Sequence, residues 1–139
     1  MANNIDKEIA NIDKSICRHI DNIIIDSRGE VSQDTVGDLR HYVEHIMFKI
    51  YCIDKNLSLD IEFSNIKSVT KYISSKGNYK YKLLKNFHKM LQSSVSHYKP
   101  TEEDSERLML KYYEYLFRIR KMMKEDYDLD LLHNLEKFP

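Results

Sequence analysis

Hydrophobic residues recur at helical spacing along most of this chain. Near the N-terminus, isoleucines follow one another three or four residues apart, which puts them on one side of a helix over residues 4–26. Similar patterns predict four more long helices and a short last one. The isoleucines of the first helix are Ile5, Ile9, Ile12, Ile16, Ile20 and Ile23, and the other predicted helices cover residues 33–54, 58–75, 79–94, 102–125 and 128–138.

Polar residues mark where some of these helices begin and end. Lys76-Gly77-Asn78 predicts a turn between the third and fourth helices, because Gly and Asn tolerate the left-handed backbone that stops a helix. The sequence TEED, from Thr101 to Asp104, predicts a capped helix start near residue 102, since its acids lie at the positive end of the helix dipole. Short connections of this kind favour antiparallel packing of neighbouring helices.

The composition agrees with an all-α fold. With only three Gly and two Pro among 139 residues, the chain has few of the turn residues that many-stranded β proteins need. We therefore expect a single domain, residues 1–139, folded as an antiparallel up-and-down bundle of five long helices plus a short C-terminal helix. Because Pro139 directly follows an amphipathic segment, we also expect this domain to be the N-terminal module of a longer protein.

Cysteine usage and hydropathy predict a cytoplasmic protein. Cys17 and Cys52 lie far apart within helical patterns and match no metal-binding or redox spacing, so we expect both to be reduced residues that fill the core. No apolar run approaches the roughly 18 residues that span a bilayer, and the N-terminus lacks the pattern of a signal peptide. We expect neither a membrane partner nor export.

Charge is distributed unevenly along the chain, although 22 basic and 22 acidic residues cancel overall. Residues 63–101 contain no Asp or Glu and carry a net charge of +8, whereas the remainder, with 14 basic and 22 acidic residues, carries −8. The eight lysines of the acid-free segment are Lys67, Lys71, Lys76, Lys80, Lys82, Lys85, Lys89 and Lys99.

Aromatic residues lie among these lysines, which favours single-stranded RNA as a partner. Lysines can follow the phosphate backbone while aromatic rings stack on unpaired bases. In the alternative, the lysines form a solvated face, or pair with the acidic remainder of the same chain or of a second copy, which would give a homodimer. The candidate RNA contacts are Lys71, Lys80, Lys82, Lys85, Lys89, Lys99, Tyr79 and Tyr81.

Two histidines of the second predicted helix raise the question of a metal site. His41 and His45 are four residues apart, the spacing at which one helix face offers two imidazoles to zinc, but the further ligands would have to come from Glu44 or from a residue distant in the sequence. We therefore expect no metal and no cofactor. By helical angle His45 points away from the apolar side and belongs at the surface, whereas Arg40 and Glu44 can pair along the helix.

Two stretches, DLRHYVEHI over residues 38–46 and FHKMLQSSVSHYKPTEEDSERLMLKYYEYL over residues 87–116, resemble the HEPN superfamily. That family has a compact helical bundle in which a short turn with a histidine, often followed by a tyrosine, precedes a long helix. The resemblance covers residues 4–125. It implies a homodimer and, in the active members of the family, a metal-independent RNA endonuclease whose arginine and histidine line a cleft at the dimer interface.

The resemblance implies that His97 acts in acid–base chemistry on a ribose 2′-hydroxyl, for which an imidazole suits because its pKa lies near neutrality. The family arginine would precede it at positions 90–92, where this chain has Met, Leu and Gln. Arg40 and His45 have the family spacing, but they cannot converge within one helix. A rearranged catalytic site would combine Arg40, whose planar guanidinium can hold a phosphate, with His97 and with Tyr98 as a supporting donor.

Three functions are compatible with these patterns. The departure from the family motif favours a non-catalytic HEPN-like module that mediates dimerisation or docks partners within a prokaryotic defence, stress or regulatory protein. The alternatives are a metal-independent endonuclease of single-stranded RNA, such as a toxin or defence RNase, and RNA binding without cleavage. A small-molecule enzyme is not supported, because the sequence has no Gly-rich phosphate loop, nucleophile motif or cysteine cluster.

Overall fold

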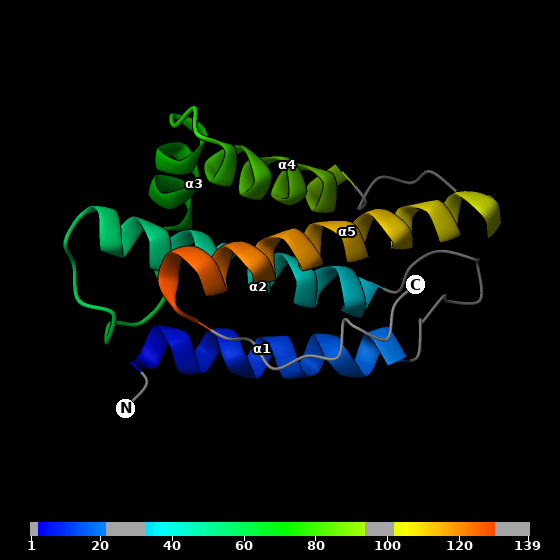
Figure 1. The fold of residues 1–139 in the computed structure, drawn as a ribbon, viewed down its shortest axis with the longest axis horizontal. Coiled ribbons are helices and arrows are strands. Elements are labelled where there is room, and N and C mark those ends of the chain that lie inside the picture. The colour runs from blue at the N-terminus through cyan, green and yellow to red at the C-terminus, as the bar shows by residue number, and fades with distance from the viewer. Residues whose placement is uncertain (1–2, 22–32, 94–101, 130–139) are drawn as a thin grey trace.

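The computed structural model describes residues 3–21, 33–93 and 102–129, and within these ranges the chain forms helices and no strands (Figure 1). The predicted all-α fold is therefore confirmed. The helices are α1 (Asn4–Asp21), α2 (Gln33–Asp54), α3 (Ile66–Ser74), α4 (Tyr79–Ser93) and α5 (Glu102–Tyr127).

The four long helices run alternately in opposite directions, as in an up-and-down bundle (Figure 1). α1 packs on α2, α2 on α4, and α4 on α5. The remaining helix, α3, has only nine residues and lies across one end of the bundle in contact with α2 and α4. The prediction of five long helices is thus wrong at the third, which begins at Ile66 rather than near residue 58.

The late start of α3 follows from two asparagines. Asn56 and Asn65 both have left-handed backbone conformations, with φ of 57° and 56°, which a right-handed helix does not accommodate. Residues 57–65 form a loop instead, and from this loop Leu59 and Phe63 pack against the core. Their helix-like spacing in the sequence is therefore the spacing of two core contacts within an irregular segment.

The same loop closes the N-terminus of α1. The backbone N–H of Ile5 donates to the carbonyl oxygen of Leu59 at 3.1 Å, and the N–H of Asn4 donates to Oδ1 of Asp60 at 3.1 Å. These donors belong to the first helical turn and have no partner within the helix. These hydrogen bonds from the first turn of α1 thereby hold the loop in place.

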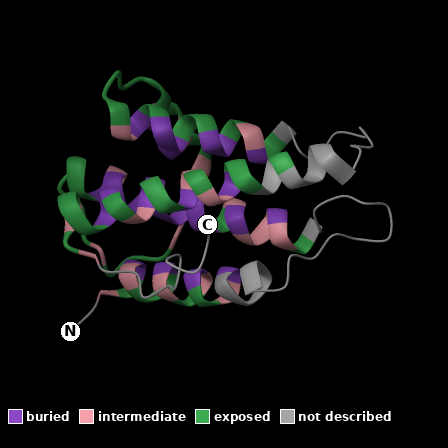
Figure 2. Cartoon of the chain, turned by 45° about the vertical axis from the view of Figure 1, so that its right-hand side comes forward, coloured by how far each residue is buried: buried purple, intermediate pink, exposed green. Residues whose placement is uncertain are grey.

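The central helix, α2, is buried on nearly every side (Figure 2). Helices α1, α3 and α4 contact it, and the loop over residues 57–65 covers a further side. The ring of Phe63 stacks on His45 with 4.4 Å between centroids. The prediction that His45 lies at the surface is therefore wrong, since the side chain is 8% exposed. The spacing of apolar residues within α2 could not reveal that a loop buries this side of the helix.

A buried ion pair joins α1 to α2. Lys49 is only 3% exposed, and its amino group pairs with the carboxylate of Asp6. Removing one partner of a buried pair leaves an uncompensated charge, which costs about 3–5 kcal/mol. The pair therefore holds α1 against the side of α2 on which Lys49 lies.

The predicted apolar sides of the other long helices are confirmed where side chains are described. The turn over residues 76–78 and the helix start at 102 are confirmed as well. The predicted end of the first helix, the cap residue Thr101 and nearly all of the last helix lie outside the described residues. The buried residues on the predicted sides are Ile5, Ile9 and Ile16 in α1, Leu83, Leu84, Phe87 and Leu91 in α4, and Tyr112, Leu116, Ile119 and Met122 in α5.

The buried thiol of Cys52 is a core residue, as predicted. Burial raises its pKa, which makes the reactive thiolate scarcer. The side chain of Cys17 lies outside the described residues. None of the helices described here combines the length and the apolar character that crossing a bilayer requires.

A buried carboxyl in α1 connects this helix to α5. Asp13 is 2% exposed. Burial raises its pKa from 3.8 to about 6, while a hydrogen bond with Tyr42 of α2 and the positive charge of Arg120 of α5 limit the rise. Between pH 4 and pH 6 the folded protein therefore binds more protons at Asp13 than the unfolded chain does, so this residue makes folding less favourable as the pH rises.

We predict that Asp13→Asn removes this pH dependence. The free energy of unfolding of the variant, relative to the natural chain, should rise by about 2–3 kcal/mol between pH 4 and pH 7.5, because an amide carries no charge to bury. Urea unfolding at a series of pH values measures the difference. Asp126→Asn, at an exposed position of α5, serves as the matched control. A difference that stays constant across this pH range would contradict the prediction.

Candidate nucleic-acid interface

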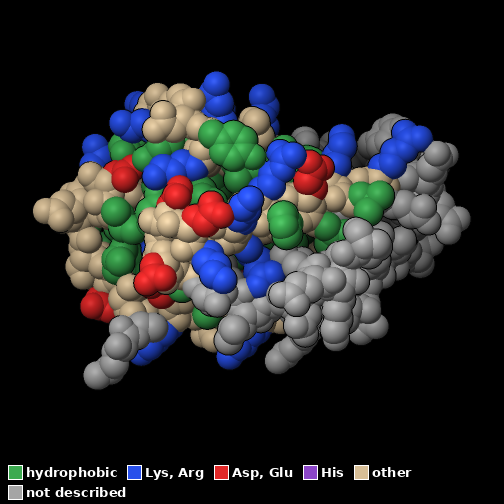
Figure 3. All heavy atoms as spheres, in the orientation of Figure 1, with side chains coloured by type: hydrophobic (Ala, Val, Ile, Leu, Met, Phe, Trp, Pro, Cys, Tyr) green, Lys and Arg blue, Asp and Glu red, His purple; other side chains and the backbone are tan. Residues whose placement is uncertain are grey.

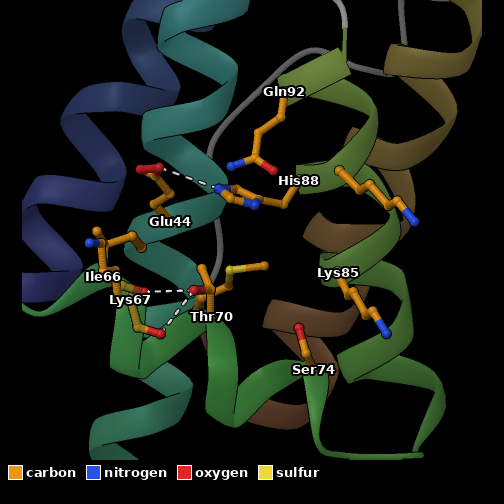
Figure 4. Close-up of a pocket in the computed structure, with 10 residues that line it drawn as sticks. Glu44, Ile66, Lys67, Thr70, Ser74, Lys85, His88 and Gln92 are labelled. Carbon is orange, nitrogen blue, oxygen red and sulfur yellow. Dashed lines mark hydrogen bonds and ion pairs between the residues drawn. The ribbon is translucent and has the colours of Figure 1, made fainter.

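A groove of about 460 Å³ lies where α3 and α4 cross α2 (Figure 4). Its lining combines three lysines with an imidazole, two hydroxyls, an amide and a single carboxylate, so cationic and hydrogen-bonding groups dominate. The lining residues are Glu44 and Met47 of α2, Ile66, Lys67, Thr70 and Ser74 of α3, and Lys85, His88, Lys89 and Gln92 of α4.

Asp54, in the last turn of α2, fixes the helices that form the groove. One of its carboxylate oxygens, Oδ2, accepts hydrogen bonds from the hydroxyls of Tyr72 at 2.7 Å and Tyr81 at 2.5 Å. Burial and these contacts with Asp54 raise the pKa of Tyr72 to about 12 and that of Tyr81 further still. Both phenols therefore remain protonated donors at neutral pH, and α3 and α4 are both tied to the end of α2.

At the floor of the groove, α2 and α4 are joined by a pair of ionisable residues. Nε2 of His88 lies 3.3 Å from Oε1 of Glu44, and both side chains are largely buried. Burial by itself raises the pKa of Glu44, but the hydrogen bond from His88 and the charges of His88, Arg40 and His41 outweigh it, so the pKa lies below its usual value. Glu44 is thus a carboxylate at neutral pH with cationic or donor groups around it.

The close-up of the groove shows how these groups are directed (Figure 4). His88 and Gln92 extend from α4 toward Glu44 on α2, whereas Lys85 extends away from that pair. The hydroxyl of Thr70 donates to the carbonyl oxygens of Ile66 and Lys67, at 2.9 and 3.1 Å. The imidazole and the amide therefore form the inner part of the groove, and Lys85 stands at its edge.

Exposed lysines surround the groove on both helices. Lys67 and Lys71 are one turn apart on α3, while Lys82, Lys85 and Lys89 share one side of α4. Within the described part of the chain, none of these five exposed lysines forms an ion pair with a carboxylate. Figure 3 shows basic side chains along the upper edge of the molecule, over α3 and α4. We call these five residues the lysine face.

Three other candidate RNA contacts are placed differently. Tyr79, at the start of α4, is 66% exposed and available for stacking. Tyr81 is only 6% exposed and turns inward to Asp54, so a base cannot stack on its ring. Lys80 is half-buried and donates to the hydroxyl of Tyr127 at 2.8 Å, with its amino group 5.0 Å from the centre of that ring. Lys80 and Tyr81 thus hold α4 against its neighbours, and Lys99 lies outside the described residues.

Of the candidate catalytic residues, only Arg40 lies within the described residues. It is half-buried on α2, one turn before Glu44, and its charge helps to lower the pKa of that carboxyl. His97 and Tyr98 lie outside the described residues, so their distance from Arg40 is not defined. Arg40 is instead linked to a different histidine, His88. The positive charges of Arg40 and His88 both lower the pKa of Glu44.

The possible zinc pair is not arranged as a metal site. His41 is exposed, whereas His45 is buried beneath Phe63, with its Nδ1 2.7 Å from the carbonyl oxygen of His41. Among the residues that the structure describes, no three His, Cys, Asp or Glu side chains are grouped to hold a metal ion.

The pairing of Glu44 with His88 was not predicted from the sequence. These residues are 44 positions apart and belong to helices that are not consecutive, so no spacing within one helix indicates the contact. One signal was available: His88 is the histidine within the acid-free segment that also falls inside a predicted helix, next to Phe87 on its apolar side. An imidazole at that edge of a helix needs a polar partner from a neighbouring helix.

A second hollow of about 460 Å³ provides a contrast. It lies between the start of α1 and the loop over residues 57–65, and Lys7 shares its lining with two carboxylates, Glu8 and Glu62. An anion would meet net repulsion there, whereas three lysines and one paired carboxylate line the groove at α3 and α4. The groove and the lysine face are therefore the better candidate site for a polyanion.

A comparison with protein-family models, with curated proteins and with solved structures finds no match.

Proposed function

We propose that this chain is a non-catalytic helical module whose partner is single-stranded RNA, bound through its phosphates on the lysine face. One observation carries the proposal: five exposed lysines stand on two neighbouring helices without a carboxylate partner in the described part of the chain. Phosphates are the anions that a row of separate ammonium groups suits, because each ammonium releases counterions from the nucleic acid on contact.

The groove supports a single strand rather than a duplex. It is concave and large enough for a phosphate with its ribose, and His88 and Gln92 offer hydrogen-bonding groups inside it. The exposed ring of Tyr79 lies on the same helix as Lys82, Lys85 and Lys89 and can stack on an unpaired base. A regular duplex would expose its phosphates to the lysines but offer neither a free base nor a backbone narrow enough to enter the groove.

The single carboxylate of the groove does not oppose this partner strongly. Glu44 accepts a hydrogen bond from His88 and lies near the positive charge of Arg40. Its negative charge is therefore compensated locally, while the ammonium groups of Lys67, Lys85 and Lys89 have no carboxylate partner among the residues that the structure describes. The balance of charge at the groove stays positive.

We also propose, from the sequence resemblance, that this module is HEPN-like and belongs to a prokaryotic defence, stress or regulatory protein. The support is the all-α order of helices and the two sequence stretches over residues 38–46 and 87–116. In the second stretch the family arginine is missing ahead of His97. That departure is the reason for proposing binding without cleavage.

One observation favours a second candidate, a metal-independent RNA endonuclease. A guanidinium, a carboxylate and an imidazole gather at one end of the groove, from Arg40, Glu44 and His88. Such groups can hold a phosphate and move the proton of a ribose 2′-hydroxyl. In this version His97 and Tyr98 would complete the site from the segment that follows α4.

If RNA binds on the lysine face, removing lysines from this face should weaken RNA binding more than removing lysines elsewhere. Lys85→Gln together with Lys89→Gln should weaken binding of single-stranded RNA about tenfold at 0.1 M salt, and should reduce the slope of log affinity against log salt by about 1.4. Lys7→Gln with Lys14→Gln removes the same charge from exposed positions of α1 and is the matched control. Filter binding at several salt concentrations measures both pairs. An equal loss in the two double variants would show only a general effect of charge.

If the chain binds RNA without cleaving it, an RNA cleavage assay should detect no activity. The natural chain, incubated with labelled single-stranded RNA in excess chelator, should leave the RNA intact over hours. Gel analysis should give the same result for Arg40→Ala, His88→Ala and His97→Ala. Cleavage by the natural chain that is lost in these variants would overturn the non-catalytic proposal and establish the nuclease.

A further inference from the structure

The hollow of about 460 Å³ between the start of α1 and the loop over residues 57–65 has an acidic rim. Figure 1 shows this loop running from the end of α2 to the start of α1. Glu8 of α1 and Glu62 of the loop are both exposed, and neither forms an ion pair within the described residues. Lys7 lines the same hollow. Two carboxylates against one ammonium group leave the rim with a negative charge.

A buried imidazole borders the same hollow. The side chain of His45 is 8% exposed, and its ring stacks on Phe63. Its Nδ1 lies 2.7 Å from the carbonyl oxygen of His41. Because a carbonyl oxygen only accepts hydrogen bonds, Nδ1 carries a proton, and in the neutral ring Nε2 is an acceptor. Nε2 has no hydrogen-bond partner among the described residues, and a donor can approach this ring from the hollow.

The backbone at the start of α1 offers nothing to an anion. The N–H groups of residues 4–7 all have acceptors already, two of them in the loop at Leu59 and Asp60 and two on Asn3. Free N–H groups at a helix start would attract an anion, but here Asp60 adds a carboxylate at that point. The groups still open to a ligand are therefore acceptors and negative charges, which suit a cation with several N–H donors.

We propose that this hollow binds a guanidinium group carried on an aliphatic chain. A guanidinium is a planar fork with five N–H donors, so it can serve acceptors on more than one side at once, here Glu8, Glu62 and Nε2 of His45. It is also more weakly hydrated than an ammonium group and stacks on aromatic faces such as that of Phe63. The aliphatic chain would contact Ile61 in the apolar part of the hollow.

The hollow is also large enough and separate from the lysine face. Its volume falls within the range of about 300–1,000 Å³ that small-molecule pockets occupy. It is formed by α1, the loop and one side of α2, whereas the lysine face belongs to α3 and α4. The proposed ligand is a cation and RNA is a polyanion, so each of the two sites repels the ligand of the other.

A titration of the isotope-labelled chain without RNA tests the proposal, with butylguanidinium as the probe. We expect a dissociation constant of about 1 mM, from shifts at Ile5, Ile61 and Phe63. Butylurea has nearly the same shape without the charge, and butylammonium has the charge without the planar fork, so both should bind at least about tenfold more weakly. Equal binding of either control, or no binding of the probe up to about 20 mM, overturns the proposal.

Variants of the rim test the two carboxylates. Glu8→Gln together with Glu62→Gln should weaken binding of butylguanidinium at least about tenfold, because two charge-assisted hydrogen bonds are lost. Glu114→Gln with Glu125→Gln removes the same charge from exposed positions of α5, which does not line the hollow, and should bind like the natural chain. An equal loss in the two double variants would show only a general effect of charge and overturn the site.

The ring of His45 gives a readout that needs no substitution. When Nε2 accepts a hydrogen bond from the probe, its nitrogen resonance should move upfield, while Nδ1 stays protonated. A Nε2 resonance that does not change at saturation contradicts the role of His45. Because no RNA is present and the lysine face is intact, failure here leaves the RNA proposal standing.

One further arm separates the two sources of such a group. A Gly-Arg-Gly peptide, blocked at both ends, presents the same guanidinium on a protein chain. Binding tighter than that of butylguanidinium would identify an arginine side chain of a partner as the ligand, and weaker binding would identify a free small molecule. A peptide that shifts only residues outside the hollow contradicts the site.

Discussion

The structure depends on one constraint: its central helix is surrounded, yet it is not apolar on every side. A helix buried all round must give each of its polar side chains a partner, because an unpaired polar group in the core costs stability. In α2 these side chains include Glu44, His45 and Lys49. His88 of α4 contacts the glutamate, and α1 supplies the aspartate that pairs with the lysine. The histidine lies beneath the loop over residues 57–65, and its Nδ1 contacts a carbonyl oxygen of α2 itself.

These contacts also determine where a surface for other molecules can form. The elements that cover α2 at one end are α3 and α4, which Asp54 ties down through two tyrosine hydroxyls. Both helices come from a segment without acidic residues, so every exposed charge that they present is positive. The groove between them reaches down to the Glu44–His88 pair. One interaction therefore contributes to the core and to the candidate binding site.

Much of this architecture could be predicted from the sequence, because apolar spacing reports directly which side of a helix is buried. The sides of α1, α4 and α5 followed from that spacing. The third helix did not, since Leu59 and Phe63 reach the core from a loop that left-handed asparagines impose. For the site, the acid-free segment correctly indicated a cationic surface, but not which lysines face inward: Lys80 pairs with Tyr127, a residue 47 positions away. Contacts between distant segments, like that of Glu44 with His88, leave no periodic signal in either segment.

The most direct test of the account is a titration of the isotope-labelled protein with a short single-stranded RNA, followed residue by residue from amide chemical shifts. We expect the largest shifts in α3 and α4, at Lys67, Lys85 and Lys89 and at His88 beside them, and little change in α1. Added salt should reverse the shifts, because phosphate contacts supply the affinity. Shifts concentrated in α1 or along the outer side of α5, or the absence of any shift at low salt, would contradict it.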